Sequence, residues 1–326
     1  MEVFEEDVLI NKKKDYVNLA RLQEPKSGVL IIDFINSIIN KKAKRSSKSY
    51  GRNYRTLIYH LNSFSKEYNC TLYTNSINEE FLDDFIYYLE SKLLKKSYIK
   101  TIIQLLKASI RKAANYGYVV DPSYDSIEID SEDIPSIYLS MNEITRIYYY
   151  PNLTNKQKKI RDLFVVGCLT ALRYSDLTTL QKADFGDKFI TKITKKTGVK
   201  VIIPIHDYVR EVYNRYDGDI SPNVTSQHFN RYIKLICKKV GLNDPVTITY
   251  TKGGEVITET KEKWELISSH TGRRSGATNL YNTGRLGLRD IMSITGHTTE
   301  KSFMRYIKTS KEDIANKLAG DMYFRK

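Results

Sequence analysis

An acidic, polar and aperiodic stretch over residues 121–135 separates two parts of this chain that both carry helical periodicity. Pro122 and Pro135 lie at its ends, and its composition is typical of a connection rather than of a helix or strand. The chain has 326 residues, of which 41% are hydrophobic, so it can build two hydrophobic cores. We therefore expect two domains joined by a linker over 121–136.

The first part predicts a small helical domain over residues 29–120. Apolar residues recur at helical spacing in four segments, which are 29–42, 55–68, 77–94 and 97–116. Gly117 is placed to end the last helix at its C′ position. Residues 1–28 have mixed charge and no clear period, so we interpret them as an N-terminal extension.

The second part, residues 137–326, predicts further helices together with small β-hairpins. Ser140 and Glu143 have the spacing of a capping box that begins a helix. The remaining elements follow from periodicity and turn residues: a long apolar helix over 159–172, a hairpin over 189–205 with its turn at Lys195–Gly198, and a second strand pair over 246–261. The fold class is therefore mainly α with small β-hairpins (α+β).

Positive charge is unevenly distributed along the chain. The net charge is +14 and the isoelectric point is near 9.3, which favours a polyanionic partner, chiefly nucleic acid. Charge alone fits an unrelated basic protein equally well. Two runs, 41–55 and 91–112, each hold seven Lys or Arg and no acidic residue. The candidate DNA-binding residues are Lys41, Lys42, Lys44, Arg45, Lys48, Arg52, Arg55, Lys95, Lys96, Lys100, Lys107, Arg111, Lys195 and Arg274.

Several classes of protein are disfavoured. The first residues are acidic and then basic, unlike a signal peptide. No apolar stretch approaches the roughly 18–20 residues of a membrane span. Three scattered cysteines without paired spacing argue against a disulfide framework and against a zinc site. We expect a soluble cytoplasmic protein that needs no metal or other cofactor.

Six residues of the second part have the chemistry needed to cut a phosphodiester: Arg173, Lys196, His270, Arg273, His297 and Tyr306. Such a reaction needs neutralised phosphate charge, a positioned nucleophile, a base for its proton and an acid for the departing oxygen. Nucleases often neutralise the phosphate with metal ions held by carboxylates. Two arginines can bind phosphate bidentately instead. A tyrosine, whose free pKa is near 10, needs positive neighbours to act as the nucleophile.

Each of these residues has a plainer explanation when it is taken alone. Arg173 also fits an ordinary arginine at a helix end, and the spacing of His270 and Arg273 is common by chance. His297 after a glycine is more often a core or capping histidine. Tyr306 is one of 25 tyrosines. The order and the spacing of the set, rather than any member, favour catalysis.

Two assignments near the first arginine keep alternatives. Lys196 shares its predicted hairpin turn with Lys195, and both are candidates for the acid that protonates the departing oxygen. Asp176 lies three residues after Arg173, where it would orient the arginine or remain a solvated surface carboxylate. The ordinary explanation for the lysines is solvated charge on a hairpin.

Taken in order, these residues resemble the tyrosine recombinase (phage integrase) family. The resemblance spans about residues 29–320 and is most specific over 270–306, where His270-Thr-Gly-Arg273 is followed by Gly296-His297 and, nine residues later, by Tyr306. The Lys-Thr hairpin and the sequence Tyr306-Ile-Lys resemble the branch found on mobile elements of Bacteroidetes.

The resemblance implies a role for each residue of the set. Arg173 and Arg273 correspond to the catalytic arginines, Lys196 to the hairpin lysine, His270 and His297 to the two histidines, and Tyr306 to the nucleophile. Asp176 stands where relatives often have Glu. The product of cleavage would be a 3′-phosphotyrosine with a free 5′-hydroxyl, resolved through a Holliday junction.

The resemblance also implies an architecture and partners. Residues 29–120 would be a SAM-like core-binding domain that forms a C-shaped clamp on duplex DNA with the catalytic domain. The active species would be a tetramer on two sites, with accessory host or directionality factors as further candidate partners. Residues 1–28 are too short for a complete arm-binding domain and are interpreted as its remnant. The tail after Tyr306 predicts an amphipathic helix (Ile314, Leu318, Met322) that docks on a neighbouring protomer or packs on its own domain.

Integration or excision of a mobile element is the expected role. Three alternatives remain: a DNA-binding regulator on the same fold that does not cut, a DNA relaxase like the type IB topoisomerases, and a basic helical RNA-binding protein. Covalent trapping on DNA tests the regulator, junction resolution on paired sites tests the relaxase, and competition between stem-loop RNA and duplex DNA tests the RNA-binding protein.

Overall fold

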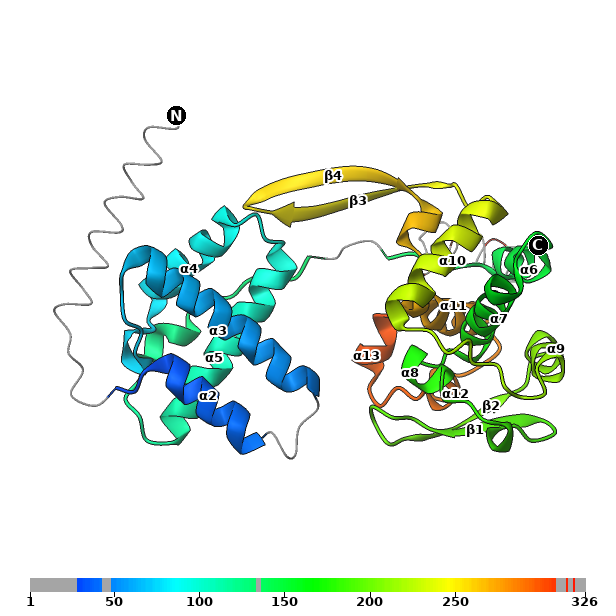
Figure 1. Cartoon of the computed structure of the whole chain (residues 1–326), viewed down its shortest axis with the longest axis horizontal. Helices are drawn as coiled ribbons and strands as arrows, with labels where there is room; N and C mark the ends of the chain where they lie inside the picture. Colours follow the sequence, from blue (N-terminus) through cyan, green and yellow to red (C-terminus); the bar gives the residue numbers. More distant parts are fainter. Residues whose placement is uncertain (1–27, 43–47, 133–135, 309–314, 316–318, 320–326) are drawn as a thin grey trace. The chain divides into compact units, whose positions relative to one another are not determined.

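A computed structural model describes residues 28–42, 48–132 and 136–308, together with residues 315 and 319. Most of the described residues are helical, and two small two-stranded sheets complete the fold (Figure 1). The predicted class, mainly α with small β-hairpins, is confirmed. Within the described ranges, no helix is both long and apolar enough to cross a membrane. The predicted extension over 1–28 and the apolar positions of the predicted tail helix lie outside the described residues, apart from Gly28.

The chain divides into two compact units. The first consists of residues 1–134 and 249–258, and the second of residues 135–248 and 259–326. The segment 249–258 is the tip of the hairpin formed by β3 (Pro245–Lys252) and β4 (Glu255–Glu262). In the first unit this tip contacts the chain around Lys95, since Lys252 forms a β-bridge with Lys95 and the Gly253 N–H donates to the Leu94 carbonyl over 3.0 Å.

The first unit is a helical bundle around an aromatic centre. Its helices are α2 (Ile31–Lys42), α3 (Lys48–Tyr68), α4 (Glu79–Ser91) and α5 (Lys96–Asn115), with 3-10 turns at Thr74–Ser76 and Pro122–Asp125. Phe64 of α3 is fully buried; it stacks on Tyr68 and meets Phe81, Phe85 and Tyr88 edge to face. Such aromatic contacts add to the free energy gained from burial alone. Gly117 has φ +84° just beyond α5, in line with the predicted C′ position.

Helix α3 begins at Lys48, earlier than the predicted start at residue 55. The first apolar residue used for the prediction is Leu57, but tyrosines extend the same face of the helix toward its N-terminus. Tyr54 is buried, and its ring lies 4.8 Å from that of Tyr50. Both hydroxyls accept hydrogen bonds from Lys112 of α5, over 3.1 and 3.2 Å. Tyrosine can therefore extend a buried helix face when a neighbouring helix supplies a polar partner.

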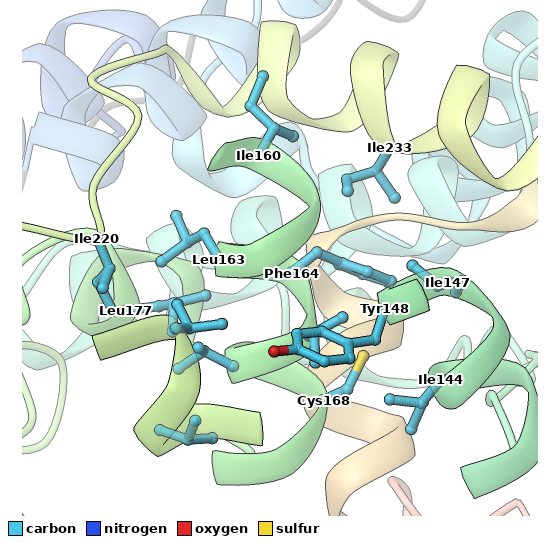
Figure 2. Packing of buried hydrophobic residues seen from close by; sticks show 14 of the residues in the cluster. Ile144, Ile147, Tyr148, Ile160, Leu163, Phe164, Cys168, Leu177, Ile220 and Ile233 are labelled. Carbon is cyan, nitrogen blue, oxygen red and sulfur yellow. The ribbon is translucent and has the colours of Figure 1, made fainter. Parts of the chain in front are cut away.

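The second unit surrounds one apolar helix, α7 (Asn155–Thr170). Its other helices are α6 (Met141–Tyr149), α8 (Tyr174–Leu177), α9 (Asp207–Arg215), α10 (Ser226–Val240), α11 (Ser269–Asn282), α12 (Leu288–Thr295) and α13 (Glu300–Met304), with 3-10 turns at Lys182–Asp184 and Lys263–Leu266. Figure 2 shows Leu163, Phe164 and Cys168 of α7 among Ile144 and Tyr148 of α6. The predicted capping box is present, since the Ser140 hydroxyl accepts from the Glu143 N–H.

The hairpin of β1 (Phe189–Ile193) and β2 (Lys200–Pro204) is antiparallel, with Ile190 opposite Ile203. Both isoleucines are buried, and alternate residues face solvent, as predicted. The turn that follows β1 holds Lys195 and Lys196 at the surface, where both side chains are exposed.

Helices α7 and α11 approach each other unusually closely because α11 carries glycines on the contact face. A Cβ placed on Gly276 would lie 2.7 Å from the Cys168 carbonyl oxygen and 3.0 Å from the Ala171 nitrogen. A Cβ placed on Gly272 would lie 3.3 Å from the Phe164 ring. Gly272 and Gly276, on either side of Arg273, therefore set the distance between α11 and α7.

Candidate active site

Arg173 follows a sharp turn at the end of α7. Ala171 caps the helix in the left-handed conformation (φ 52°, ψ 21°), and Arg173 is the N-cap of the short α8. This turn takes the chain out of the apolar helix, and Arg173 as a whole is partly buried. Its Nη1 is buried and has no hydrogen-bond partner. A buried N–H group without an acceptor is costly, and the arrangement is suited to an anion.

Arg273 lies in α11 and is almost completely buried, with 1% of its surface exposed. Its Nη1 donates to the Ala171 carbonyl over 2.6 Å, and its Nη2 donates to His297 Nε2 over 3.0 Å. Nε has no partner. Burial, and secondly the charge of Arg173, lower the pKa of Arg273 to about 10, so the guanidinium still carries its charge at neutral pH.

His297 follows Gly296, which ends α12 in the left-handed conformation (φ 67°). The imidazole is buried; its ring meets Phe303 edge to face and lies 4.8 Å from the Tyr306 ring. Burial, and then the charges of Arg273 and Arg173, lower the pKa of His297 to about 3. The histidine is therefore neutral at physiological pH.

Tyr306 follows α13 and is held through its backbone. Its N–H donates to the Phe303 carbonyl over 2.8 Å, and its carbonyl accepts from the Thr278 hydroxyl over 3.0 Å. The same hydroxyl accepts from the Lys308 N–H over 3.3 Å. Arg273 lies over the Tyr306 ring, with its Cζ 5.2 Å from the ring centroid. The phenol is thus placed against a buried positive charge.

His270 begins the same helix as Arg273 and keeps an exposed edge. Burial lowers the pKa of His270 first, and the charges of Arg274, Arg273, Lys196 and Arg173 lower it further. The charges of both arginines and of the hairpin lysine therefore disfavour the protonated form of this histidine. A neutral imidazole is able to accept a proton.

The hairpin turn is fastened to α8 by a buried carboxylate. Asp176 Oδ1 accepts from the Lys195 N–H over 2.8 Å, and Oδ2 is buried without a partner. The hydrogen bond of this carboxylate goes to the lysine turn rather than to Arg173, and Asp176 is fully buried, so the alternative of a solvated surface carboxylate is wrong. Lys192 is occupied elsewhere, since its Nζ donates to the Thr179 carbonyl and to Asp184, each over 2.6 Å. Lys195 and Lys196 remain the candidate acids.

Thr278 and Ala171 contact candidate catalytic residues, and the sequence reasoning missed both. The Thr278 hydroxyl donates to the backbone carbonyl of Tyr306, and the backbone carbonyl of Ala171 accepts from Arg273. Their residue types carry no chemical signal, so only the contact geometry identifies them. A hint for Ala171 was its place directly before Leu172-Arg173, where the apolar helix had to end.

The candidate DNA-binding residues have varied surroundings. Arg52 and Arg55 are exposed on α3, whereas Lys41 lies over the Tyr116 ring and Lys95 over the Tyr250 ring. Lys44 and Arg45 lie outside the described residues, as do the side chains of Lys42 and Lys48. Lys96 is half-buried at the start of α5, and Arg274 donates to the Ile137 carbonyl over 2.8 Å.

Three cations of α5 hold the segment that was predicted to be the linker. Lys107 donates to the carbonyls of Asp125 and Ile127, and Arg111 pairs with both oxygens of Asp125 at 3.2 Å. Lys100 donates to the Ser131 hydroxyl over 2.7 Å. A surface hollow of about 380 Å³ lies between these side chains and residues 125–129. The basic run 91–112 therefore packs its own chain as well as presenting charge.

Two family models match the chain in consecutive regions. The model of the phage integrase SAM-like domain matches residues 30–129, and that of the phage integrase family matches residues 138–313. A search of curated proteins by sequence gave no match. In the described ranges, no group of three or more His, Cys, Asp and Glu side chains is placed to hold a metal ion.

Solved structures with a similar fold are integrases bound to DNA. A lambda integrase dimer on a COC′ core site is 18% identical, with a TM-score of 0.64 over 86% of this chain and 96% of that chain. A lambda integrase tetramer on a Holliday junction is also 18% identical, with a TM-score of 0.64 over 89% and 80%. The Tn1549 transposon integrase with circular intermediate DNA is 16% identical, with a TM-score of 0.62 over 90% and 100%.

Proposed function

The chain belongs to the phage integrase family of tyrosine recombinases, and we propose that Tyr306 is the nucleophile of its reaction and that the side chains gathered around Arg273 are its catalytic machinery. The protein is a site-specific recombinase, an enzyme that cuts and rejoins DNA. The observation that carries the residue assignment is the set of contacts of one buried arginine. Arg273 contacts both His297 and Tyr306, while its own Nε and Nη1 of Arg173 lack partners.

In the proposed reaction, a phosphodiester occupies the position that these unpartnered N–H groups leave open. Arg173 and Arg273 bind its non-bridging oxygens and neutralise the charge that grows on them in the pentavalent transition state. His297 supports this charge through its contact with Arg273. Two fixed guanidinium groups act without reorganisation, so they favour the transition state over the ground state.

Proton transfer balances the bond changes. Tyr306 attacks phosphorus and forms a 3′-phosphotyrosine, while the bond from phosphorus to the 5′ oxygen breaks. His270 takes the phenolic proton, because burial and neighbouring cations keep it neutral. Lys196 gives a proton to the departing 5′ oxygen, with Lys195 of the same turn as the alternative. A 5′-hydroxyl of a partner strand then attacks the phosphotyrosine and restores the phenol.

Each of three consecutive segments of the chain has a proposed role. Residues 29–120 bind core DNA, residues 121–136 connect, and residues 137–326 carry out the chemistry. The lambda integrase structures contain a dimer on a core site and a tetramer on a Holliday junction. We extend that assembly to this chain, with integration or excision of a mobile element in the cytoplasm as its role. Exposed cations such as Arg52 and Arg55 would contact phosphates, so binding should weaken steeply with salt.

Two finer parts of the proposal concern ancestry and partners. The sequence Tyr306-Ile-Lys and the Lys-Thr turn support an origin on mobile elements of Bacteroidetes. Docking of the tail through Ile314, Leu318 and Met322 on a neighbouring protomer, and host or directionality factors, complete the expected assembly.

Covalent trapping tests the function. The protein is incubated in EDTA with a nicked suicide duplex that carries its recombination site, beside a Tyr306→Phe variant, and a denaturing gel is examined for a DNA-shifted band. The expected result is a 3′-linked adduct with the wild type and none with Tyr306→Phe. Absence of an adduct on a site that both proteins bind tightly would favour a regulator that does not cut. Persistence of the adduct in the variant would move the nucleophile to another residue.

A further inference from the structure

The turn between β1 and β2 is closed by hydrogen bonds from one buried threonine. Thr194 directly follows β1 and is 2% exposed. Its backbone N–H donates to the Val199 carbonyl over 2.9 Å, and its carbonyl accepts from the Gly198 N–H over 2.9 Å. Gly198 has φ +68°, a conformation that glycine adopts readily in tight turns. Residues 195–198 therefore form a compact loop of four residues whose ends are tied together at Thr194.

The Thr194 side chain adds bonds that the backbone alone does not provide. Its hydroxyl donates to the Val199 carbonyl over 3.1 Å and lies 2.8 Å from the Thr197 hydroxyl. A hydroxyl has one proton, which Thr194 gives to the carbonyl, so the Thr197 hydroxyl is the donor to Thr194. The methyl carbon of Thr194 would lie 3.7 Å from a Cβ placed on Gly296. Thr194 thus lies between the loop and the end of α12.

Lys196 lies between two residues of this loop that are both held in place. Before it, the Lys195 N–H donates to Oδ1 of the buried Asp176 over 2.8 Å. After it, the Thr197 hydroxyl forms the bond just described. Lys196 itself is exposed, and its charge is one of those that lower the pKa of His270. The loop therefore fixes the backbone on both sides of Lys196, and the charge of Lys196 acts on the candidate active site.

We propose that Thr194 is a positioning residue that holds Lys196 where it can protonate the departing 5′ oxygen. This inference rests on the proposed function, in which Lys196 is the general acid. A general acid has to lie within hydrogen-bond reach of the reacting oxygen, so a small displacement of the loop that carries it is costly.

Thr194→Val is suited to test this role because it keeps the shape of the side chain and removes only its hydrogen bonds. The Val199 carbonyl keeps its bond with the N–H of residue 194. Thr197 is exposed, so its hydroxyl can bind water instead. The substitution should therefore loosen the loop without unfolding the domain.

A substrate that needs no general acid separates positioning from folding. The nicked suicide duplex is prepared with sulfur in place of the 5′ bridging oxygen of the scissile phosphate, and single-turnover cleavage by the full chain is compared with that of the ordinary duplex. A departing thiolate is a much weaker base than an alkoxide, so it leaves without a proton. Loss of a correctly placed acid should then slow cleavage of the ordinary duplex alone.

On the ordinary duplex, Lys196→Ala should cleave about 10²–10³-fold more slowly than the wild type, as expected for a lost general acid. Thr194→Val should be slower by about tenfold, which corresponds to the loss of one hydrogen bond. On the sulfur duplex both variants should match the wild type. Thr194→Ser keeps the hydroxyl and should be close to the wild type on both duplexes.

The double variant provides an independent test. If Thr194 acts through Lys196, Thr194→Val should cause no further loss in the Lys196→Ala background, because the two effects then share one step. Thr191→Val is the matched control, since Thr191 is exposed on the same strand, and it should cleave both duplexes at the wild-type rate.

Three outcomes would overturn the inference and leave the proposed function in place. They are equal slowing of Thr194→Val on both duplexes, additive losses in the double variant, and a wild-type rate for Thr194→Val on the ordinary duplex. A different pair of results would remove its premise: Lys196→Ala that stays slow on the sulfur duplex, or a wild type that forms no adduct with either duplex. In that case Lys196 is not the acid, and the positioning role of Thr194 fails with it.

Discussion

The cations around Arg273 and those along α5 carry the same charge in opposite surroundings. Arg273 is 1% exposed and keeps one N–H without an acceptor, and burial lowers its pKa. The Arg111 side chain is 59% exposed, and hydrogen bonds with Tyr124 and Asp125 raise its pKa. A buried cation in fixed geometry can act on one phosphate, whereas an exposed and paired cation contributes mainly screened, long-range attraction.

The largest loss of activity is expected when the buried arginine is replaced. Arg273→Lys keeps the charge but cannot reach Ala171, His297 and Tyr306 together. We expect single-turnover cleavage to fall about 10²–10³-fold, the usual cost of losing a preorganised donor in an active site. DNA affinity should change little. Arg274→Lys, one residue along the same helix, is the matched control and should lose less than about tenfold. Equal losses in both variants would contradict the special role of Arg273.

Gly276 in the second unit and Gly51 in the first differ in how much space surrounds them. A Cβ on Gly276 would meet the Cys168 carbonyl oxygen at 2.7 Å, whereas a Cβ on Gly51 in α3 would have nothing closer than 3.9 Å. Gly276→Ala should therefore destabilise the protein by about 1–3 kcal/mol through overpacking and reduce cleavage. Gly51→Ala should be stabilising by about 0.5–1 kcal/mol, as expected inside a helix. Thermal unfolding measures both, and a stable Gly276→Ala variant with full activity would show that α7 and α11 tolerate separation.

A smaller effect is expected at the surface of the first unit. Arg52→Ala should weaken DNA binding about threefold and reduce the slope of affinity against salt by about one. Arg111→Ala should weaken it less, because Arg111 is already paired with Asp125. Affinity is measured over a range of salt concentrations, with the cleavage rate of saturated complexes as the control. A drop in that rate for Arg52→Ala would mean that the exposed cations take part in the chemistry.

The smallest predicted effect is a shift of the acidic limb of the pH–rate profile. Burial and four cations lower the pKa of His270 below its usual 6.5, so the histidine is mostly neutral at pH 6.5 and above. As a base, it should lose activity only below pH 6.5 when cleavage is measured at low DNA concentration, where the rate reports the free enzyme. Arg274→Gln removes a cation and should move this limb upward. A limb above pH 6.5 in the wild type would exclude His270 as the base.

Periodicity was sufficient to predict the four described helices of the first unit and the long apolar helix of the second, because burial of one face imposes a repeat on the sequence. The helix through Leu163 and the hairpin at Ile190 are examples. The early start of α3 was missed, since Tyr54 counts as buried only when Lys112 of another helix satisfies its hydroxyl. Attachment of residues 125–131 to α5 was missed for a similar reason: a polar, aperiodic segment reveals nothing about its partners.

For the proposed site, the sequence by itself determined which residue types are present and in what order, and this order is what predicted a catalytic set. Arg173, His270, Arg273 and Tyr306 belong to that set. Only the tertiary structure decided which groups are buried, which N–H groups lack acceptors, and that Thr194 lies beside Gly296. Protonation and orientation depend on the partners that folding brings from distant segments, and a sequence pattern contains the side chains but not the distances between them.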